Sequence, residues 1–275
     1  MALEICDGCG EPFEGDPCPH CGRPAAERGD LRRLPAEVVV AFVEHAHAFL
    51  AAGPWRQAVL AVAAGSFIGF GAMLSVVLTV GVDVPGVARL LLGLGFAAGF
   101  VLVILSGSAL FTEVNVLLPE LFLSGRGPRL RLFRFWVIVY VGNLVGAIFV
   151  GFMLNAADVI GPAQGERLAE LIGEKMRFVS GKILGIALPI LAFVALGVQH
   201  VPANMGYFAA GLIHGGTGTT VPQAFVWNLL PATIGNLIGG AVLVSLLFWY
   251  AFGTDAKRAS LARANDHVQA TRPHG

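Results

Sequence analysis

Uninterrupted apolar runs occupy most of the chain after residue 56, and they leave few fold classes open. A helix needs roughly 20 apolar residues to cross a hydrocarbon core about 30 Å thick. Only 13% of the 275 residues are charged and 56% are hydrophobic, whereas soluble domains are roughly 25% charged. The sequence therefore predicts an all-α polytopic membrane protein that lies in a lipid bilayer.

The composition also disfavours several function classes. The formal net charge is zero, so nothing indicates binding to nucleic acid. No nucleophile–base pair, nucleotide-binding loop or membrane-embedded metal cluster is visible, so an enzyme is not expected. The first apolar block follows about fifty polar or mixed residues, which does not fit a secretory signal peptide.

The apolar runs predict spans at residues 57–81, 86–106, 133–154 and 225–252, and a further one at 182–213. Four arginines lie in the loop before the third of these spans, and the tail from residue 254 is also basic. Because basic loops favour the cytosolic side of a membrane, both segments are predicted to be cytosolic.

Polar residues interrupt two of the apolar runs. Residues 106–115 contain Ser, Thr, Glu and Asn, and residues 193–205 contain Gly, His200 and Pro202. A broken helix at membrane depth is tolerated only where protein or water satisfies the freed backbone groups. A His or Asn at that depth marks a cavity or a specific partner. Each break is therefore predicted to form half of a substrate site in a channel or transporter.

The chain contains an internal repeat. Residues 140–147 read YVGNLVGA and residues 233–240 read TIGNLIGG, and each copy follows one of the breaks. Two halves of this kind indicate an inverted-repeat transporter with two broken helices. The small residues of the motif predict close helix packing, and Asn143 and Asn236 are expected to hydrogen-bond a neighbour.

The second half lacks one span. Residues 158–177 hold a Pro and several charges and cannot cross about 30 Å of hydrocarbon. The charge bias demands an even number of crossings, yet five spans are predicted. Three explanations are open: a span has been lost, a helix at 164–178 substitutes for it inside an oligomer, or the second half is not properly inserted.

Residues 1–24 form a separate module that precedes the membrane domain. It holds all four cysteines in two CxxC pairs, Cys6 with Cys9 and Cys18 with Cys21. Four thiolates at this spacing suit tetrahedral zinc, whose binding would supply the folding energy of a small zinc ribbon. Two disulfides, or a tail without a ligand, are the alternatives. Reduced thiolates also imply a cytosolic N-terminus.

Residues 25–56 join this module to the domain at 57–253. They combine a charged linker with an amphipathic helix at 36–53, which is expected to lie at the membrane interface. His45 and His47 are two residues apart and do not share a helix face well, so we expect them to face solvent or the interface.

Residues 36–253 resemble the formate/nitrite transporter family. The resemblance rests on Leu110-Phe111-Thr112, on YVGNLVGA, on residues 181–197, on His200 with Ala203-Asn204-Met205, and on Asn228 to Gly240. It implies an aquaporin-like fold of six spans and a homopentamer with one pore per subunit. It also implies passage of small monovalent anions such as formate, nitrite or hydrosulfide, across the inner (cytoplasmic) membrane with both termini cytosolic.

The chain departs from the family pattern at several points. The fourth span, with its pore-side polar residue, has no counterpart. Ala109 stands where the family often has an acid, and Val201-Pro202 replaces a common Ser-Ile. The zinc module is not part of the usual pattern.

The resemblance also implies a set of pore residues. Thr112 and His200 should face each other at the pore centre, with Asn204 bracing the second break and no cofactor in the pore. His200 could attract an anion as a cation or give it a proton. The constriction residues would be Phe96, Phe100 and Phe193 on one side and Leu110 and Phe111 on the other. Taken alone, these side chains fit core packing or lipid contact equally well.

Glu113 follows Thr112 and is expected to act as a helix cap or ion-pair partner near the cytosolic mouth, or as a proton relay. The sequence therefore favours an anion channel or proton-coupled transporter. A non-transporting membrane scaffold or sensor, whose zinc module binds a cytosolic partner, is the alternative that the missing span supports.

Overall fold

The computed structural model describes residues 4–5, 12–13, 35–125, 128–176 and 199–254. Within these ranges one antiparallel strand pair, β1 (Glu4–Ile5) with β2 (Pro12–Phe13), precedes a body made of helices. The helices are α1 (Pro35–Ala51), α2 (Pro54–Thr79), α3 (Pro85–Ser106), α4 (Phe111–Leu123), α5 (Arg129–Ala156), α6 (Pro162–Met176), α8 (Val201–His214), α9 (Val221–Ala224), η3 (Phe225–Leu229), α10 (Leu230–Ile238) and η4 (Gly239–Leu246), where η marks π-helical turns.

Four helical runs in the described part are long and apolar enough to cross a membrane. They are Pro54–Thr79, Pro85–Ser106, Arg129–Ala156 and Val221–Thr254. These runs agree with the four uninterrupted spans that the sequence predicts, and their ends differ by a few residues. Two begin earlier than predicted at a proline, which fits the first helical turn because no backbone donor is needed there. Of the fifth predicted span, residues 182–198 lie outside the described ranges and the remainder forms α8.

Helices α2 and α5 approach each other closely through glycine. A Cβ atom on Gly146 would collide with the Val62 carbonyl, and one on Gly65 would collide with the Asn143 carbonyl. Only glycine leaves room for such contact, as is common where helices pack in lipid. The first copy of the repeated motif therefore holds α5 against α2, as its small residues predict.

Helices α6 and α8 run antiparallel to each other. The backbone of Gly165 lies against His214, Gly211 lies against Ile172, and the Lys175 ammonium lies 5.0 Å from the Tyr207 ring centroid. Residue numbers therefore increase along α6 as they decrease along α8. The two helices have 15 and 14 residues, or about 21–23 Å at 1.5 Å per residue, so neither crosses a bilayer alone.

One side chain contacts both the end of α6 and the residues that precede α8. The Asn228 side-chain amide donates to the Lys175 carbonyl at 2.7 Å and to Gln199 Oε1 at 3.1 Å. Residues 177–198 lie outside the described part, but both of its flanks are held by this one amide group. The end of α6 and the residue that precedes His200 therefore lie close together inside the molecule.

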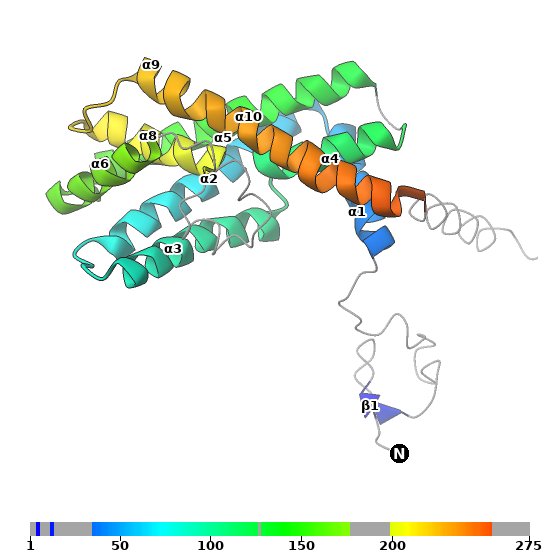
Figure 1. Ribbon diagram of the computed structural model, residues 1–275, viewed down its shortest axis with the longest axis horizontal. Coiled ribbons are helices and arrows are strands. Elements are labelled where there is room, and N and C mark those ends of the chain that lie inside the picture. Colours follow the sequence, from blue (N-terminus) through cyan, green and yellow to red (C-terminus); the bar gives the residue numbers. More distant parts are fainter. Residues whose placement is uncertain (1–3, 6–11, 14–34, 126–127, 177–198, 255–275) are drawn as a thin grey trace, which may run out of the picture.

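In Figure 1, α6, α8 and α9 gather at one end of the helical body, with α1 and α4 toward the other. Asn155, at the end of α5, contacts His214 at the end of α8. At the other end, Val39 and Val40 of α1 pack on Phe248 and the aromatic residues that follow it. Helix α1 and the last described residues therefore lie at the same end of the helical body.

This topology predicts which engineered cysteines share a side of the membrane. Ala163→Cys in α6 and Asp83→Cys in the α2–α3 turn should react with an impermeant maleimide from the same side, and Arg131→Cys only from the other. Peptide mass spectrometry separates these adducts from those of the four native cysteines. Labelling of Ala163→Cys together with Arg131→Cys would refute the topology.

Candidate functional site where two broken helices meet

Two half-length helices start inside the molecule rather than at its ends. Helix α3 ends at Gly107, whose left-handed conformation (φ 61°) is one that glycine adopts easily. The chain is extended at Leu110 and begins α4 at Phe111. In the second half, His200 is extended and α8 begins at Val201. Each break thus exposes backbone groups that need partners at membrane depth.

One asparagine side chain satisfies each break in the same way. Asn143 Oδ1 accepts from the Phe111 N–H at 2.9 Å, and its amide donates to the Ala109 carbonyl at 3.0 Å. Asn236 Oδ1 accepts from the Val201 N–H at 3.0 Å, and its amide donates to the Gln199 carbonyl at 2.8 Å. In both halves the asparagine thus joins the first residue of a half-helix to the residue two positions earlier.

These two asparagines do more than the sequence predicts for them. Helix packing and one hydrogen bond to a neighbour are expected from the repeated motif, and both are present. The additional function is to clamp the breaks, and Asn143 also donates to the Ala61 carbonyl of α2 at 2.9 Å. The similar position of Asn143 and Asn236 after the two breaks was the sequence signal for this role.

The two breaks meet through one side-chain contact. Thr112 Oγ1 lies 3.0 Å from His200 Nε2, although 88 residues separate them in the sequence. Thr112 is the second residue of α4 and His200 is the N-cap of α8. The pairing expected from the resemblance is therefore present.

Backbone geometry assigns the proton on the His200 ring. Nδ1 accepts from the Ala203 N–H at 3.3 Å and so caps α8. A ring nitrogen that accepts a hydrogen bond carries no proton, so the neutral ring holds its proton on Nε2. Nε2–H then donates to Thr112 Oγ1, which leaves the Thr112 hydroxyl proton available to another acceptor. A second proton on the ring would remove the helix cap.

The first turn of α8 is otherwise satisfied. Val201 donates to Asn236, Pro202 has no N–H, and the Asn204 N–H donates to the His200 carbonyl at 2.8 Å. The helix therefore offers no free backbone donor at its first residues, although its dipole still places partial positive charge there. His200 Nε2–H donates to Thr112 Oγ1, so the pair itself presents the Thr112 hydroxyl proton at the junction.

One aromatic ring packs directly on this polar pair, and further apolar side chains of the prediction are buried nearby in the sequence. The Phe96 ring lies edge-on to the His200 ring with centroids 5.4 Å apart. Phe96 and Leu110 are buried, and Phe100 is partly buried against the core. The Phe111 ring stacks on Trp136 and meets Tyr140 edge-on, at 5.5 and 5.0 Å. The fifth constriction residue of the prediction, Phe193, lies outside the described ranges.

Asn204 belongs to an amide network behind the junction. Its amide donates to Gln199 Oε1 and to Asn228 Oδ1, both at 2.7 Å. Asn228 lies on the π-helical turn η3 and, as described above, also holds the end of α6. Gln199 and Asn228 were not among the predicted site residues, although an amide inside an otherwise apolar span was a usable signal.

Glu113 lies beside α1 rather than in the polar pair. Glu113 Oε1 is 3.9 Å from His45 Nε2, and the His45 ring packs on Phe49 with centroids 4.7 Å apart. Partial burial lowers the pKa of His45, because the charged ring loses hydration. The contact is an ion pair only where His45 is protonated while Glu113 is ionised, so the ion-pair role of Glu113 stays a prediction.

The four cysteines of the N-terminal module lie outside the described residues. Strands β1 and β2 flank the first CxxC pair, and they place Ile5 opposite Pro12. Among the residues that the structure describes, no group of three or more His, Cys, Asp or Glu side chains could hold a metal ion. Zinc binding by Cys6, Cys9, Cys18 and Cys21 therefore stays a prediction.

Comparison with known proteins gives consistent matches. A profile of the family described as "Formate/nitrite transporter" matches residues 36–179 and 168–250. A "Probable formate transporter" of Methanothermobacter thermautotrophicus is 33% identical over 242 residues, which cover 70% of this chain and 88% of that protein.

Two solved structures resemble the fold. One is described as an "FNT family ion channel", with a TM-score of 0.69, 25% identity, and coverage of 79% of this chain and 98% of that one. The other is a "Pentameric formate channel with formate bound", with a TM-score of 0.60, 25% identity, and coverage of 72% and 97%.

The asparagine clamp can be tested by removing it. Asn143→Leu should destabilise the protein, because it leaves the Phe111 N–H and the Ala109 carbonyl unpaired at a cost of roughly 1–3 kcal/mol each. Thermal unfolding in detergent measures the effect. Asn155→Leu, at the partly exposed end of α5, is the control and should shift the midpoint less. Equal shifts would argue against a clamp at the break.

Proposed function

The chain belongs to the formate/nitrite transporter family, and we propose that it conducts small monovalent anions of the formate, nitrite or hydrosulfide class through a pore centred on Thr112 and His200. The observation that carries this proposal is the 3.0 Å contact between the two side chains where the broken helices meet. A formate channel with formate bound is among the proteins of similar fold.

The pair offers an anion the Thr112 hydroxyl as a hydrogen-bond donor, and His200 Nε2–H becomes a second donor when its bond to Thr112 Oγ1 opens. A small anion loses hydration in a narrow apolar pore, at a high free-energy cost. The Thr112 hydroxyl and His200 Nε2–H are placed to replace part of that hydration. The N-terminal ends of α4 and α8 add partial positive charge from two directions.

The capping bond of His200 affects whether its ring takes up a proton during transport. A cationic ring would hold an anion more strongly and could release a proton to it, but it would give up the Ala203 N–H bond that starts α8. The neutral ring is therefore the resting form, and an incoming anion must compensate the loss of the cap before the cation is favoured. In proton-coupled passage the His200 ring becomes protonated in this way, whereas in channel-like passage it stays neutral.

Two further sets of residues complete the proposed pore. Phe96 and Phe100 on α3, with Phe193, would form one apolar constriction, and Leu110 and Phe111 would form the other. Such constrictions exclude hydrated ions by dewetting. Asn204 would act behind the pair, where its bonds to Gln199 and Asn228 hold the second break.

We also propose that α6 serves in place of the family's fourth span. The two pieces of the family match overlap at residues 168–179, so one part of this chain corresponds to two places in the profile. This overlap is expected where family sequence between those places is missing. Leu168 and Ile172 pack on Gly211 of α8, which supports a role for α6 in covering the second half-helix.

The remaining features follow the family and the charge pattern. A pentameric relative supports a homopentamer, and the aquaporin-like inverted repeat is supported by the matching asparagine clamps. The arginine-rich start of α5 and the basic tail favour a multi-pass protein of the inner membrane with cytosolic termini. The β1–β2 pair around the first CxxC supports a zinc ribbon.

The pore pair can be tested by anion flux into proteoliposomes. His200→Asn should lower formate or nitrite flux at least about tenfold while the protein stays folded, because Asn is a good helix N-cap but lacks the ring donor. Thr112→Val should also lower flux, and Thr112→Ser should restore most of it. Unchanged flux in both His200→Asn and Thr112→Val would rule out the proposed pore centre.

The zinc module can be tested apart from the pore. Purified protein should contain about one zinc per chain, and Cys9→Ser should lose it because three thiolates bind more weakly than four. Flux by the Cys9→Ser protein should stay close to that of the unaltered chain. A metal-free native protein would contradict the assignment.

The scaffold alternative rests on the missing fourth span. It requires that the unaltered protein passes no weak-acid anion and that residues 1–34 capture a cytosolic partner in a Cys9-dependent manner. Measurable anion flux would exclude it.

A further inference from the structure

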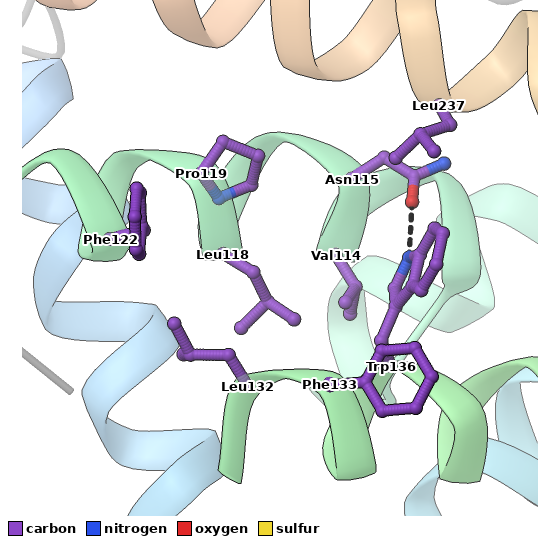
Figure 2. A pocket seen from close by; sticks show the side chains of 9 residues that line it. All are labelled: Val114, Asn115, Leu118, Pro119, Phe122, Leu132, Phe133, Trp136 and Leu237. Carbon is purple, nitrogen blue, oxygen red and sulfur yellow. Dashed lines mark hydrogen bonds between the residues drawn. The ribbon is translucent and has the colours of Figure 1, made fainter. Parts of the chain in front are cut away.

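An apolar groove opens on the surface between α4, α5 and α10, away from the Thr112–His200 pair. Figure 2 shows Leu118 and Phe122 of α4 on one side, Leu132 and Phe133 of α5 on the other, and Leu237 of α10 near the deep end. Its volume is about 330 Å³, near the lower limit of roughly 300–1,000 Å³ for ligand sites. The groove is therefore large enough for an elongated apolar ligand.

No polar atom reaches the surface of the groove. Its deep end is closed by the Trp136 indole N–H, which donates to Asn115 Oδ1 at 2.6 Å (Figure 2). The surface that lines the groove is wholly apolar. At the rim, the Phe122 and Phe133 side chains remain 46% and 61% exposed. A ligand of matching chemistry is a hydrocarbon chain and not a polar solute.

A positive charge lies at the open end of the groove. Arg129 is one helical turn before Leu132 and Phe133, so it shares their face of α5. Its guanidinium carbon lies 5.4 Å above the Phe122 ring, which belongs to the groove rim. In the described part of the chain, Arg129 forms no ion pair with a carboxylate. The stacked guanidinium still has its edge free to donate to a phosphate.

We propose that this groove binds an anionic phospholipid, with one acyl chain between Leu118 and Leu132 and the phosphate at Arg129. A helix face that places a basic residue beside an apolar groove at a membrane surface matches both parts of such a lipid. The leaflet is the one on the side of the arginine-rich loop, which the charge pattern makes cytosolic.

A second copy of the chain matches this site less well. Most exposed carboxylates of the described part, those of Asp83, Asp158 and α6, lie at the opposite end of the molecule, and Glu44 of α1 is the exception. A neighbouring subunit in the same orientation would therefore not bring those groups to Arg129. A lipid phosphate supplies the missing negative charge at the correct depth.

Native mass spectrometry of the full-length assembly tests the headgroup. Phosphatidylglycerol should bind about fivefold more tightly than phosphatidylcholine with the same acyl chains, the size expected for one basic side chain at an anionic surface. Arg129→Gln should abolish that preference, and Arg131→Gln, the same charge change on another face of α5, should retain it. Equal binding of both lipids, or equal effects of both variants, would overturn the proposal.

A photo-crosslinking residue tests the occupant of the groove. Benzoyl-phenylalanine in place of Phe133 should form a lipid adduct in membranes, and the yield should fall in the Arg129→Gln background. The same residue in place of Leu130, which is 78% exposed, is the control and should give a yield that does not depend on Arg129. A crosslink from position 133 to another copy of the chain would show that a subunit covers the groove and would overturn the proposal.

Discussion

The structure depends on two side-chain amides that satisfy backbone groups where helices are broken inside the membrane. Without Asn143 the Phe111 N–H and the Ala109 carbonyl would have no partner, and Asn236 does the same for Val201 and Gln199. Hydrocarbon offers no hydrogen bonds, so an unclamped break would be expelled or would refold into a continuous helix. The clamps fix where α4 and α8 begin, and therefore where Thr112 and His200 meet.

The cap of α8 adds a second constraint at the same place. One imidazole ring both starts a helix and faces the threonine, so its protonation state is tied to backbone structure. This coupling makes the ring a neutral donor at rest and gives its protonation a structural consequence. The predicted zinc module and the groove at Arg129 lie outside this coupling, which lets pore function be separated from both by substitution.

Much of this architecture could be predicted from the sequence. The apolar runs predict the four long helices, and the His200 and Thr112 positions follow from the two polar interruptions and the family resemblance. The antiparallel placement of α6 could not be predicted, because residues 162–176 read as too polar to enter a membrane and their partner α8 is distant in the sequence. The sequence also did not predict that the Asn228 amide would bond both the end of α6 and Gln199 before α8. This contact depends on a π-helical turn that no residue pattern identifies.

The central claim is that an anion passes between Thr112 and His200 where the half-helices meet. A cryo-electron microscopy map of the assembly, reconstituted in lipid with formate, tests it most directly. The account predicts density for a small ligand within hydrogen-bond distance of both Thr112 Oγ1 and His200 Nε2. A His200 ring turned toward lipid, or ligand density only in places remote from this pair, would contradict it.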